Sequence, residues 1–229
     1  MLRRFSLFIV LILISGLLAS PVSFADTSAA PDFIDVPKNH WAYEDVHRLR
    51  DLKITYGIGG NRFGLEKTIT RGEFLAFLVR LMGWEIINPE KGSFLDNMDP
   101  GHHFYGTIET ALRHGVITKD SDYFRTNDNI TREEMAIMIV RTLGYDALAR
   151  QLNSSERPFR DVERNIGYIA IGKDFGIFAG DGINFYPYST AKREEAAAMM
   201  MRMYNKLTAP MEELHAFYAI SSASQMDKF

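Results

Sequence analysis

The sequence predicts an all-α protein in which three helix-loop-helix repeats form a compact pseudo-threefold assembly. One observation is a motif that recurs in related form at residues 69–74, 130–135 and 191–196, which places its arginine at the evenly spaced positions 71, 132 and 193. A second is that the apolar residues after each copy fall at spacings of three, four and seven, the pattern of a helix with one buried face. A third is size, because a unit of roughly 60 residues buries little surface alone and three units can share one core.

The first 25 residues are expected to be a secretory signal peptide and not part of the fold. Arg3 and Arg4 precede an apolar run from Phe5 to Leu18, and Ala25 is a small residue before a plausible cleavage point. A membrane-spanning helix needs about 20 apolar residues, and this run is only 14 residues long. The sequence therefore predicts export, with no membrane association after cleavage.

Composition excludes several classes of function. Cleavage removes two of the 26 basic residues and none of the 29 acidic ones, so the net charge changes from −3 to −5. This charge provides no bulk attraction to nucleic acid. The chain has no cysteine, so an exported form must be stable without disulfides. Catalytic, phosphate-binding and metal-ligating motifs are missing from the sequence, so we expect no enzyme activity, cofactor or metal.

The first two repeats are predicted at residues 33–83 and 94–144. The first helix of each has an apolar stripe, formed by Trp41, Val46, Leu49 and Leu52 in one repeat and by Phe104, Ile108, Ala111 and Leu112 in the other. Loops rich in turn-forming residues follow at 57–64 and 119–126. Each second helix begins with a capping box, formed by Thr70 and Glu73 or by Thr131 and Glu134, and ends near a glycine, Gly83 or Gly144.

The third repeat, at residues 159–207, departs from this pattern. Its first helix has a stripe formed by Tyr168, Ile169, Ile171 and Phe175, and two glycines, Gly167 and Gly172, weaken it. Lys192 stands where the capping threonine should be, and the cap is expected to shift to Ser189 or Thr190. The methionines of the second helix are interpreted as core packing.

Arginine occupies the first turn of each predicted second helix. A helix N-terminus carries partial positive charge, so a cation there is unfavourable by about 0.3–1 kcal/mol. One explanation is a carboxylate or phosphate held between each guanidinium and the free backbone N–H groups. The other is that each arginine pairs with a nearby acid such as Asp35, Asp96 or Asp161. The residues alone leave both open.

Two segments of the first repeat resemble an S-layer homology repeat. They are Phe-Ile-Asp-Val-Pro-Lys-Asn-His-Trp-Ala at 33–42 and Ile-Thr-Arg-Gly-Glu-Phe at 69–74, and looser versions extend the likeness to about residue 207. The resemblance implies an all-α pseudo-trimer located at the cell wall or S-layer surface. It also implies non-covalent binding to secondary cell-wall polysaccharide of Gram-positive bacteria, often through pyruvylated N-acetylmannosamine.

The resemblance also implies which residues bind the polysaccharide. It assigns contacts with the anionic pyruvyl group, in grooves between repeats, to Arg71, Arg132 and Arg193. It assigns sugar stacking to Trp41, for which core packing is an equal alternative. In the third repeat, Gly180 and Asp181 match the family loop. The second repeat has His102-His103 in place of His-Trp and the third lacks this pair, so one or two working grooves are expected.

Residues 208–229 break the repeat and are predicted to be a tail. The segment from Leu214 to Ser221 has the pattern of a strand and is similar to the opening barrel strand of family 18-type glycoside hydrolases. A barrel of about 250 residues has no room here. The tail is therefore either the start of a truncated following domain or an ordinary chain end.

The sequence thus predicts a secreted, non-catalytic module that anchors to anionic, pyruvylated wall polysaccharide. Two alternatives stay open. One is the N-terminal anchor fragment of a cell-wall glycoside hydrolase, and the other is a surface adaptor that binds protein in the same grooves. The sequence does not indicate an oligomeric state.

Overall fold

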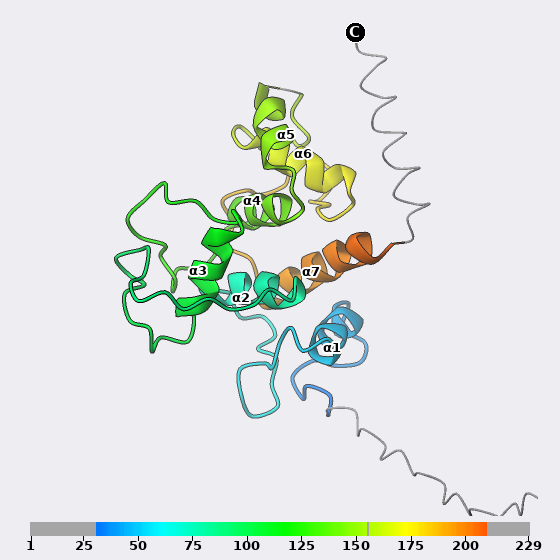
Figure 1. Cartoon of the computed structure of the whole chain (residues 1–229). Coiled ribbons are helices and arrows are strands. Elements are labelled where there is room, and N and C mark those ends of the chain that lie inside the picture. Colours follow the sequence, from blue (N-terminus) through cyan, green and yellow to red (C-terminus); the bar gives the residue numbers. More distant parts are fainter. Residues whose placement is uncertain (1–30, 155, 210–229) are drawn as a thin grey trace, which may run out of the picture.

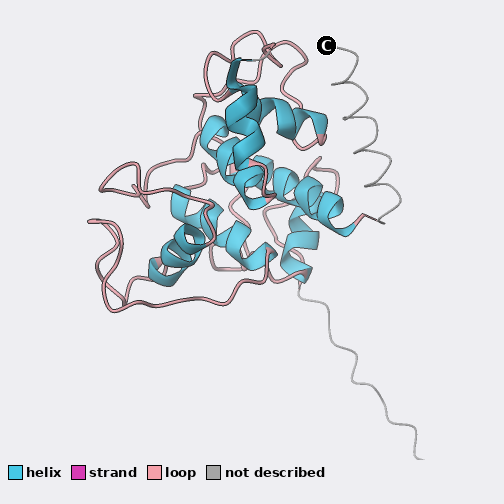
Figure 2. Ribbon diagram, turned by 45° about the horizontal axis from the view of Figure 1, so that its top comes forward, coloured by secondary structure: helices cyan, strands magenta, loops and turns pink. Residues whose placement is uncertain are grey.

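The computed structural model describes residues 31–154 and 156–209. This part of the chain contains seven α-helices, one short 3₁₀ helix and no β-sheet, which confirms the all-α prediction (Figures 1 and 2). The predicted signal peptide at 1–25 and the predicted strand at 214–221 lie outside the described residues. None of the described helices is long and apolar enough to cross a bilayer.

Each repeat contributes a first and a second helix. The first helices are α1 (Tyr43–Asp51), α3 (Tyr105–Arg113) and α6 (Ile166–Asp174), and the second helices are α2 (Arg71–Leu81), α4 (Arg132–Thr142) and α7 (Arg193–Thr208). The sequence did not predict α5 (Asp146–Gln151) or the 3₁₀ helix at Leu152–Ser154, which lie between the second and third repeats.

Each first helix packs against the second helix of a different repeat. Helix α3 packs on α2, α6 packs on α4, and α1 packs on α7, so the first repeat is joined to the last (Figure 1). No repeat therefore completes its own core. The connection between α1 and α7 brings together the first and the last helix of the described chain, and it closes the order of contacts into a cycle.

The segments before the second helices contact one another in the same cyclic order. Isolated β-bridges pair Thr70 with Asn129, Thr131 with Thr190, and Thr68 with Lys192. Backbone hydrogen bonds run beside them, from Ile130 to Ile69, from Ala191 to Ile130 and from Ile69 to Ala191. These contacts show that all three repeats meet at one place. The pseudo-threefold symmetry of the whole assembly stays a prediction.

One hydrophobic core runs through all three repeats. The second helices supply much of it, and its fully buried side chains include Phe63, Phe74, Leu78, Ile130, Met135, Ile139 and Phe185. Met199, Met200 and Met203 of α7 are also buried, which confirms that this methionine stripe is core. Replacing one such phenylalanine by alanine typically costs about 3–5 kcal/mol.

Two local predictions were wrong, and the glycines of α6 have a packing role that was not predicted. Trp41 precedes α1 and its side chain is 61% exposed, so it is not part of the buried stripe. The cap of α7 does not shift, because Lys192 is the N-cap residue and its N–H donates to the Glu195 carboxylate. The glycines of α6 are close-packing positions, since a Cβ at Gly172 would lie 1.9 Å from the Phe178 ring. Tertiary packing here outweighs helix propensity.

Candidate functional site

Three aspartates fold the interhelix loops and do not pair with the helix-start arginines. Asp35 accepts hydrogen bonds from the N–H groups of Phe63, Gly64 and Leu65 at 2.7–3.2 Å. Asp96 binds the backbone at 124–126 and Asp161 binds the backbone at 185–186 in the same way. Partial burial raises the pKa of Asp35, but the three N–H donors outweigh it and hold the pKa below its ordinary value.

Each helix-start arginine binds the loop of a neighbouring repeat. The Nε group donates to the backbone carbonyl of a phenylalanine, and the guanidinium lies over the ring of the same residue. The Nε–O distances are 2.9 Å for Arg71–Phe124, 2.8 Å for Arg132–Phe185 and 3.0 Å for Arg193–Phe63. The guanidinium carbon lies 4.8, 4.8 and 5.2 Å from the ring centres in the same order. One side chain thus combines a hydrogen bond with a cation–π contact.

The acid partner of each arginine is the capping glutamate of the neighbouring repeat. Nη1 of the arginine approaches Oε1 of the glutamate at 2.6 Å in Arg71–Glu134, 2.6 Å in Arg193–Glu73 and 3.6 Å in Arg132–Glu195. The other oxygen of each glutamate accepts the N-cap N–H of its own helix. The expectation that each arginine pairs with an acidic residue is therefore confirmed. The partners are the capping glutamates, and Asp35, Asp96 and Asp161 were the wrong candidates.

The backbone N–H groups at the helix starts are not free to bind an anion. Arg71 N donates to Asp128 O and Gly72 N donates to Thr126 O, both at 2.9 Å. Equivalent bonds run from Arg132, Glu133 and Arg193 to carbonyls of neighbouring loops. The N–H groups of these five residues are therefore occupied, which argues against the explanation in which they hold an anion.

Burial reinforces the structural role of these arginines. The side chains of Arg71 and Arg193 are 12% and 4% exposed. Loss of solvent lowers the pKa of Arg71 and of Arg132, and the glutamate beside each one partly opposes this shift. A guanidinium stays charged over the physiological pH range, so each paired glutamate faces a permanent cation.

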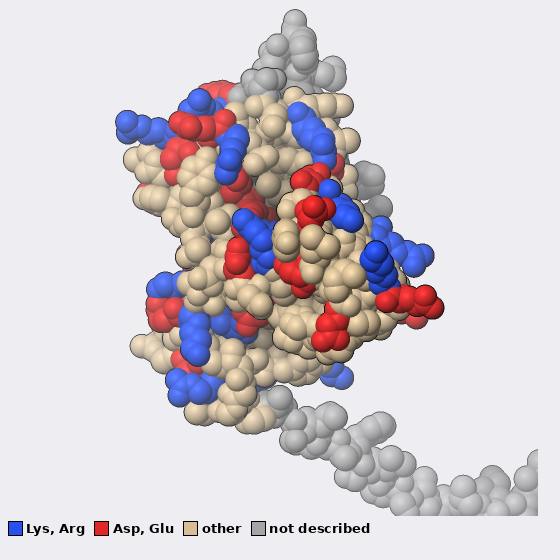
Figure 3. All heavy atoms as spheres, turned by 90° about the vertical axis from the view of Figure 1, so that its left-hand side faces the viewer, with Lys and Arg blue, Asp and Glu red and all other residues tan. Residues whose placement is uncertain are grey.

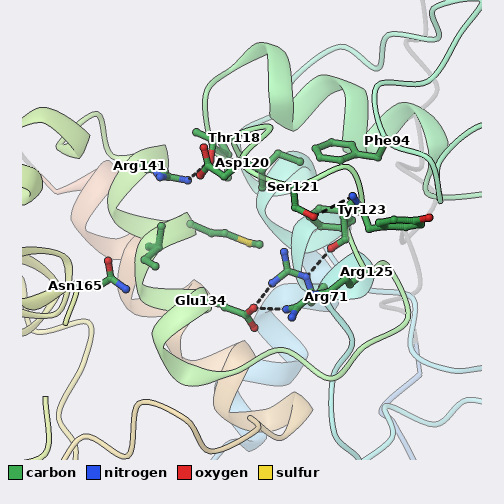
Figure 4. A pocket seen from close by; sticks show the side chains of 15 residues that line it. Arg71, Phe94, Thr118, Asp120, Ser121, Tyr123, Arg125, Glu134, Arg141 and Asn165 are labelled. Atoms are coloured by element: carbon green, nitrogen blue, oxygen red, sulfur yellow. Dashed lines mark hydrogen bonds and ion pairs between the residues drawn. The ribbon is translucent and has the colours of Figure 1, made fainter. Parts of the chain in front are cut away.

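Two clefts open beside these pairs. The first, here called the Arg71 cleft, has a volume of about 430 Å³, and its lining includes Arg71, Tyr123, Arg125, Glu134, Arg141 and Asn165. Figure 4 shows Arg71 and Arg125 converging on Glu134, with Arg141 on another wall. The second, the Arg193 cleft, has a volume of about 250 Å³, and its lining includes Tyr56, Glu73, Arg80, His103, Phe104 and Arg193.

The two clefts occupy equivalent places in successive repeats. Glu134 and Arg141 of the first cleft correspond to Glu73 and Arg80 of the second, at the same interval that separates Arg71 from Arg132. Each cleft also receives one helix-start arginine from another repeat. Each therefore brings together a helix-start arginine, a second arginine at the equivalent position and one capping glutamate, and has a tyrosine on its wall. The Arg71 cleft has Arg125 and Asp120 in addition. On the face drawn in Figure 3, basic and acidic side chains are interleaved and do not form one field of a single sign.

The sequence analysis missed a second series of arginines. Arg80, Arg141 and Arg202 lie on α2, α4 and α7 and are separated by the same repeat interval as the helix-start arginines. Arg80 and Arg202 donate through Nη1 to the carbonyls of Ile54 and Ile177, each at 3.1 Å. The repeat interval that identified the first series could also have identified this one.

The other predicted binding residues lie outside both clefts. Trp41 is largely exposed, so it is not packed in the core. Its ring centroid lies 5.5 Å from that of His40. Stacking on a sugar ring stays a prediction. Asp181 shapes its own loop, because Oδ1 accepts the N–H groups of Ile183 and Asn184. These bonds and one from Tyr186 lower the pKa of Asp181. A Cβ at Gly180 would lie 2.2 Å from Asn184 O, so this position requires glycine.

His103 lines the Arg193 cleft at the position that corresponds to Trp41. The histidines before these two residues make equivalent hydrogen bonds. Nδ1 of His40 accepts from Ala42 N at 3.2 Å, and Nδ1 of His102 accepts from Phe104 N at 3.4 Å. Desolvation lowers the pKa of His103, and the positive charges of His102 and Arg80 add to this shift while Glu73 opposes it. Within the described residues, no group of three or more acidic or histidine side chains could hold a metal ion.

Comparison with known proteins gives a consistent family. The S-layer homology domain pattern matches residues 32–75 and 99–136. A stretch of 178 residues, 74% of the chain, is 32% identical to an amylopullulanase of Thermoanaerobacterium thermosulfurigenes and covers 9% of it. The chain is 30% identical over 201 residues, 84% of its length, to an exoglucanase of Acetivibrio thermocellus, of which it covers 17%.

A surface layer protein is also similar. The chain is 31% identical over 156 residues, 64% of its length, to the surface layer protein of Brevibacillus choshinensis and covers 13% of it. The chain therefore spans only 9% to 17% of the length of these three relatives. The likeness concerns a module that larger proteins of different activity share.

Replacing Arg193 by alanine should destabilise the fold. The change removes the bond to Phe63 and leaves Glu73, whose side chain is 30% exposed, without its cation. The loss should exceed about 1 kcal/mol and stay below the roughly 3–5 kcal/mol that is typical of a fully buried pair. Urea unfolding followed by circular dichroism measures this loss. The control is Arg113→Ala, which removes an exposed arginine from the last turn of α3 and should cost less than about 0.5 kcal/mol. Equal stability of the two variants would contradict the inter-repeat role of Arg193.

Proposed function

Since the chain belongs to the S-layer homology family, we propose that it is a non-catalytic cell-surface module that binds an anionic polysaccharide of the cell wall. The observation that carries this proposal is the pair of equivalent clefts between repeats. In each lining the arginines outnumber the carboxylates by one, three to two in the Arg71 cleft and two to one in the Arg193 cleft, although the chain has a negative net charge.

The lining of the clefts suits a sugar that carries a carboxylate. A guanidinium edge binds a carboxylate through two parallel hydrogen bonds. Tyr56 and Tyr123 are exposed aromatic side chains on the walls of the two clefts, and they offer a flat apolar face and a hydroxyl group to a sugar ring. A pyruvyl ketal combines a carboxylate with a methyl group, so pyruvylated N-acetylmannosamine is the proposed recognition unit.

The proposed roles of the individual residues follow from their positions. Arg71 and Arg193 each present a guanidinium to a cleft while binding the adjacent loop. Arg132 makes the equivalent loop contact and is proposed for the third junction. Trp41, which is solvent-exposed, is proposed to stack on a sugar ring outside the two clefts. We also propose that the chain is secreted and that its repeats span residues 33–83, 94–144 and 159–207.

The relatives favour a tethering role for this module in larger polypeptides. Several carry the names of polysaccharide-degrading enzymes, and the part similar to this chain is a minor fraction of each. An anchor for a wall-associated glycoside hydrolase is therefore the second proposal. Translating the genomic DNA downstream of the coding sequence would decide it, because an encoded catalytic domain is expected under this alternative and not under the first.

Binding to purified cell walls should depend on pyruvyl groups. The mature chain is incubated with Gram-positive wall sacculi before and after mild acid removal of pyruvyl ketals, and the bound fraction is measured after sedimentation. At least tenfold weaker binding to the treated walls is expected, which corresponds to a loss of about 1.4 kcal/mol. Equal binding to both preparations would contradict carboxylate recognition, and binding only to wall-associated protein would favour an adaptor.

Acidification should strengthen binding through His103. Because the pKa of His103 is lowered from 6.5, its ring is neutral at pH 7.5 and gains a proton only in more acidic solution. Protonation adds a cation to the Arg193 cleft near Arg80, while a ligand carboxylate stays ionised at pH 5. Affinity should rise about two- to fivefold, as expected for one partly exposed charge of about 0.5–1 kcal/mol.

The His103→Gln variant supplies the control for this effect. Its affinity should change little between pH 7.5 and pH 5, because no group replaces the imidazole. The stability effect has the opposite sign, since a depressed histidine pKa means that protonation opposes the folded state below about pH 6.5. Thermal melting at both pH values separates the two effects. A wild-type affinity that falls on acidification of the folded protein would contradict the role of His103.

A further inference from the structure

We infer that Asp146 pairs with Arg141 and neutralises its charge in the Arg71 cleft. Of the two clefts, the Arg193 cleft is therefore the principal carboxylate site. The inference rests on the proposed function and concerns which equivalent site is available. It follows from the different partners of Arg141 and Arg80, two arginines that occupy the same position in successive repeats.

Arg141 of the Arg71 cleft is already bound to a carboxylate. Its Nε group donates to Asp146 Oδ1 at 2.9 Å, and its side chain is 12% exposed. The carboxylate is itself held, since Tyr168 Oη donates to Oδ1 at 2.6 Å and Arg150 Nε donates to Oδ2 at 2.8 Å. Arg141 therefore meets an internal anion before any ligand arrives.

The ionisation state of Asp146 supports this arrangement. Partial burial raises its pKa, but the hydrogen bonds from Tyr168, Arg141 and Arg150 outweigh burial and bring the pKa below its ordinary value. Asp146 is thus a carboxylate at neutral pH. A ligand carboxylate would have to displace it from Arg141 or bind beside it against charge repulsion.

Arg80 of the Arg193 cleft has no such partner. Its Nη1 donates to the Ile54 carbonyl, and its guanidinium lies 5.5 Å from the centre of the Tyr56 ring. The residue is solvent-exposed, and no carboxylate among residues 31–154 and 156–209 forms an ion pair with it. The remaining N–H groups of Arg80 can therefore receive an external carboxylate.

The cause of this difference is the additional helix α5. Glu85 is the equivalent of Asp146 in the first repeat, so both repeats carry an acid at the same position. The turns that end α2 and α4 are also alike, because Trp84 N donates to Val79 O and Tyr145 N donates to Val140 O. After this point the second repeat continues into α5, whereas residues 85–89 are not helical. Asp146 begins α5 and reaches Arg141, while Glu85 stays exposed.

The matched pair Arg80→Gln and Arg141→Gln tests the inference. Titration calorimetry of the mature chain with the methyl glycoside of pyruvylated N-acetylmannosamine gives affinity and stoichiometry. Arg80→Gln should weaken binding at least tenfold, and Arg141→Gln should change it less than twofold. The control Arg113→Gln lies outside both clefts and should bind as the wild type does. Similar losses in the Arg80 and Arg141 variants, both melting as folded proteins, would overturn the inference.

The Asp146→Asn variant is expected to increase binding, whereas Arg80→Gln is expected to weaken it. Neutralising this residue should free Arg141 and raise the stoichiometry by one site or strengthen the weaker site at least fivefold. Asp51→Asn, which disturbs a surface pair with Arg50, is the matched control and should change neither value. A folded Asp146→Asn variant that titrates as the wild type does would overturn the inference.

The outcomes separate this inference from the proposed function. If the wild-type chain binds neither the glycoside nor purified walls, the proposed function is wrong and the inference falls with it. If the wild-type chain binds and the Arg80 and Arg141 variants lose affinity equally, the proposed function stands and only the inequality of the clefts is wrong.

Discussion

The contact between a helix-start arginine and the next repeat is the interaction on which the rest of the structure depends. Arg193 combines a bond to the Phe63 carbonyl, a cation–π contact with the same ring and an ion pair with Glu73. Glu73 at the same time caps its own helix. One interaction thus couples the start of α2 to the start of α7, and related contacts do so at the other two junctions. The cation at a helix N-terminus, unfavourable locally, is stabilised by a partner from another repeat.

This coupling also produces the candidate binding sites. Arg71 and Arg193 each reach across to a neighbouring loop, and a cleft lies where the two repeats meet, with the arginine in its wall. The proposed recognition therefore involves side chains that also join the repeats, so a loss of binding in an arginine variant has to be separated from a loss of stability. The second series, represented by Arg80 and Arg141, is less involved in joining the repeats and is better suited to tune recognition. Under the proposed inequality of the clefts, the insertion of α5 alters one cleft without a change in the repeat motif.

Much of the fold could be predicted because its signals are local. The interval between Arg71, Arg132 and Arg193, the capping boxes and the apolar spacings gave the second helices and much of their buried faces. What failed depended on contacts between distant segments. Asp35 was one candidate partner for an arginine, whereas the actual partner is the capping glutamate of another repeat. Nor could the pattern show that Phe178 packs against Gly172 of α6. Helix α5 has six residues and no strong pattern, and Asp146 gained its role only from that helix.

The most direct test of this account is a double-mutant cycle between Arg193 and Glu73. The free energy of unfolding is measured by urea denaturation for the wild type, Arg193→Ala, Glu73→Gln and the double variant. Glu73→Gln keeps a side-chain oxygen for the cap, so the cycle isolates the inter-repeat pair. A coupling energy of about 1–3 kcal/mol is expected for a contact of this kind. Additive effects, within about 0.5 kcal/mol, would show that the pair does not join the repeats.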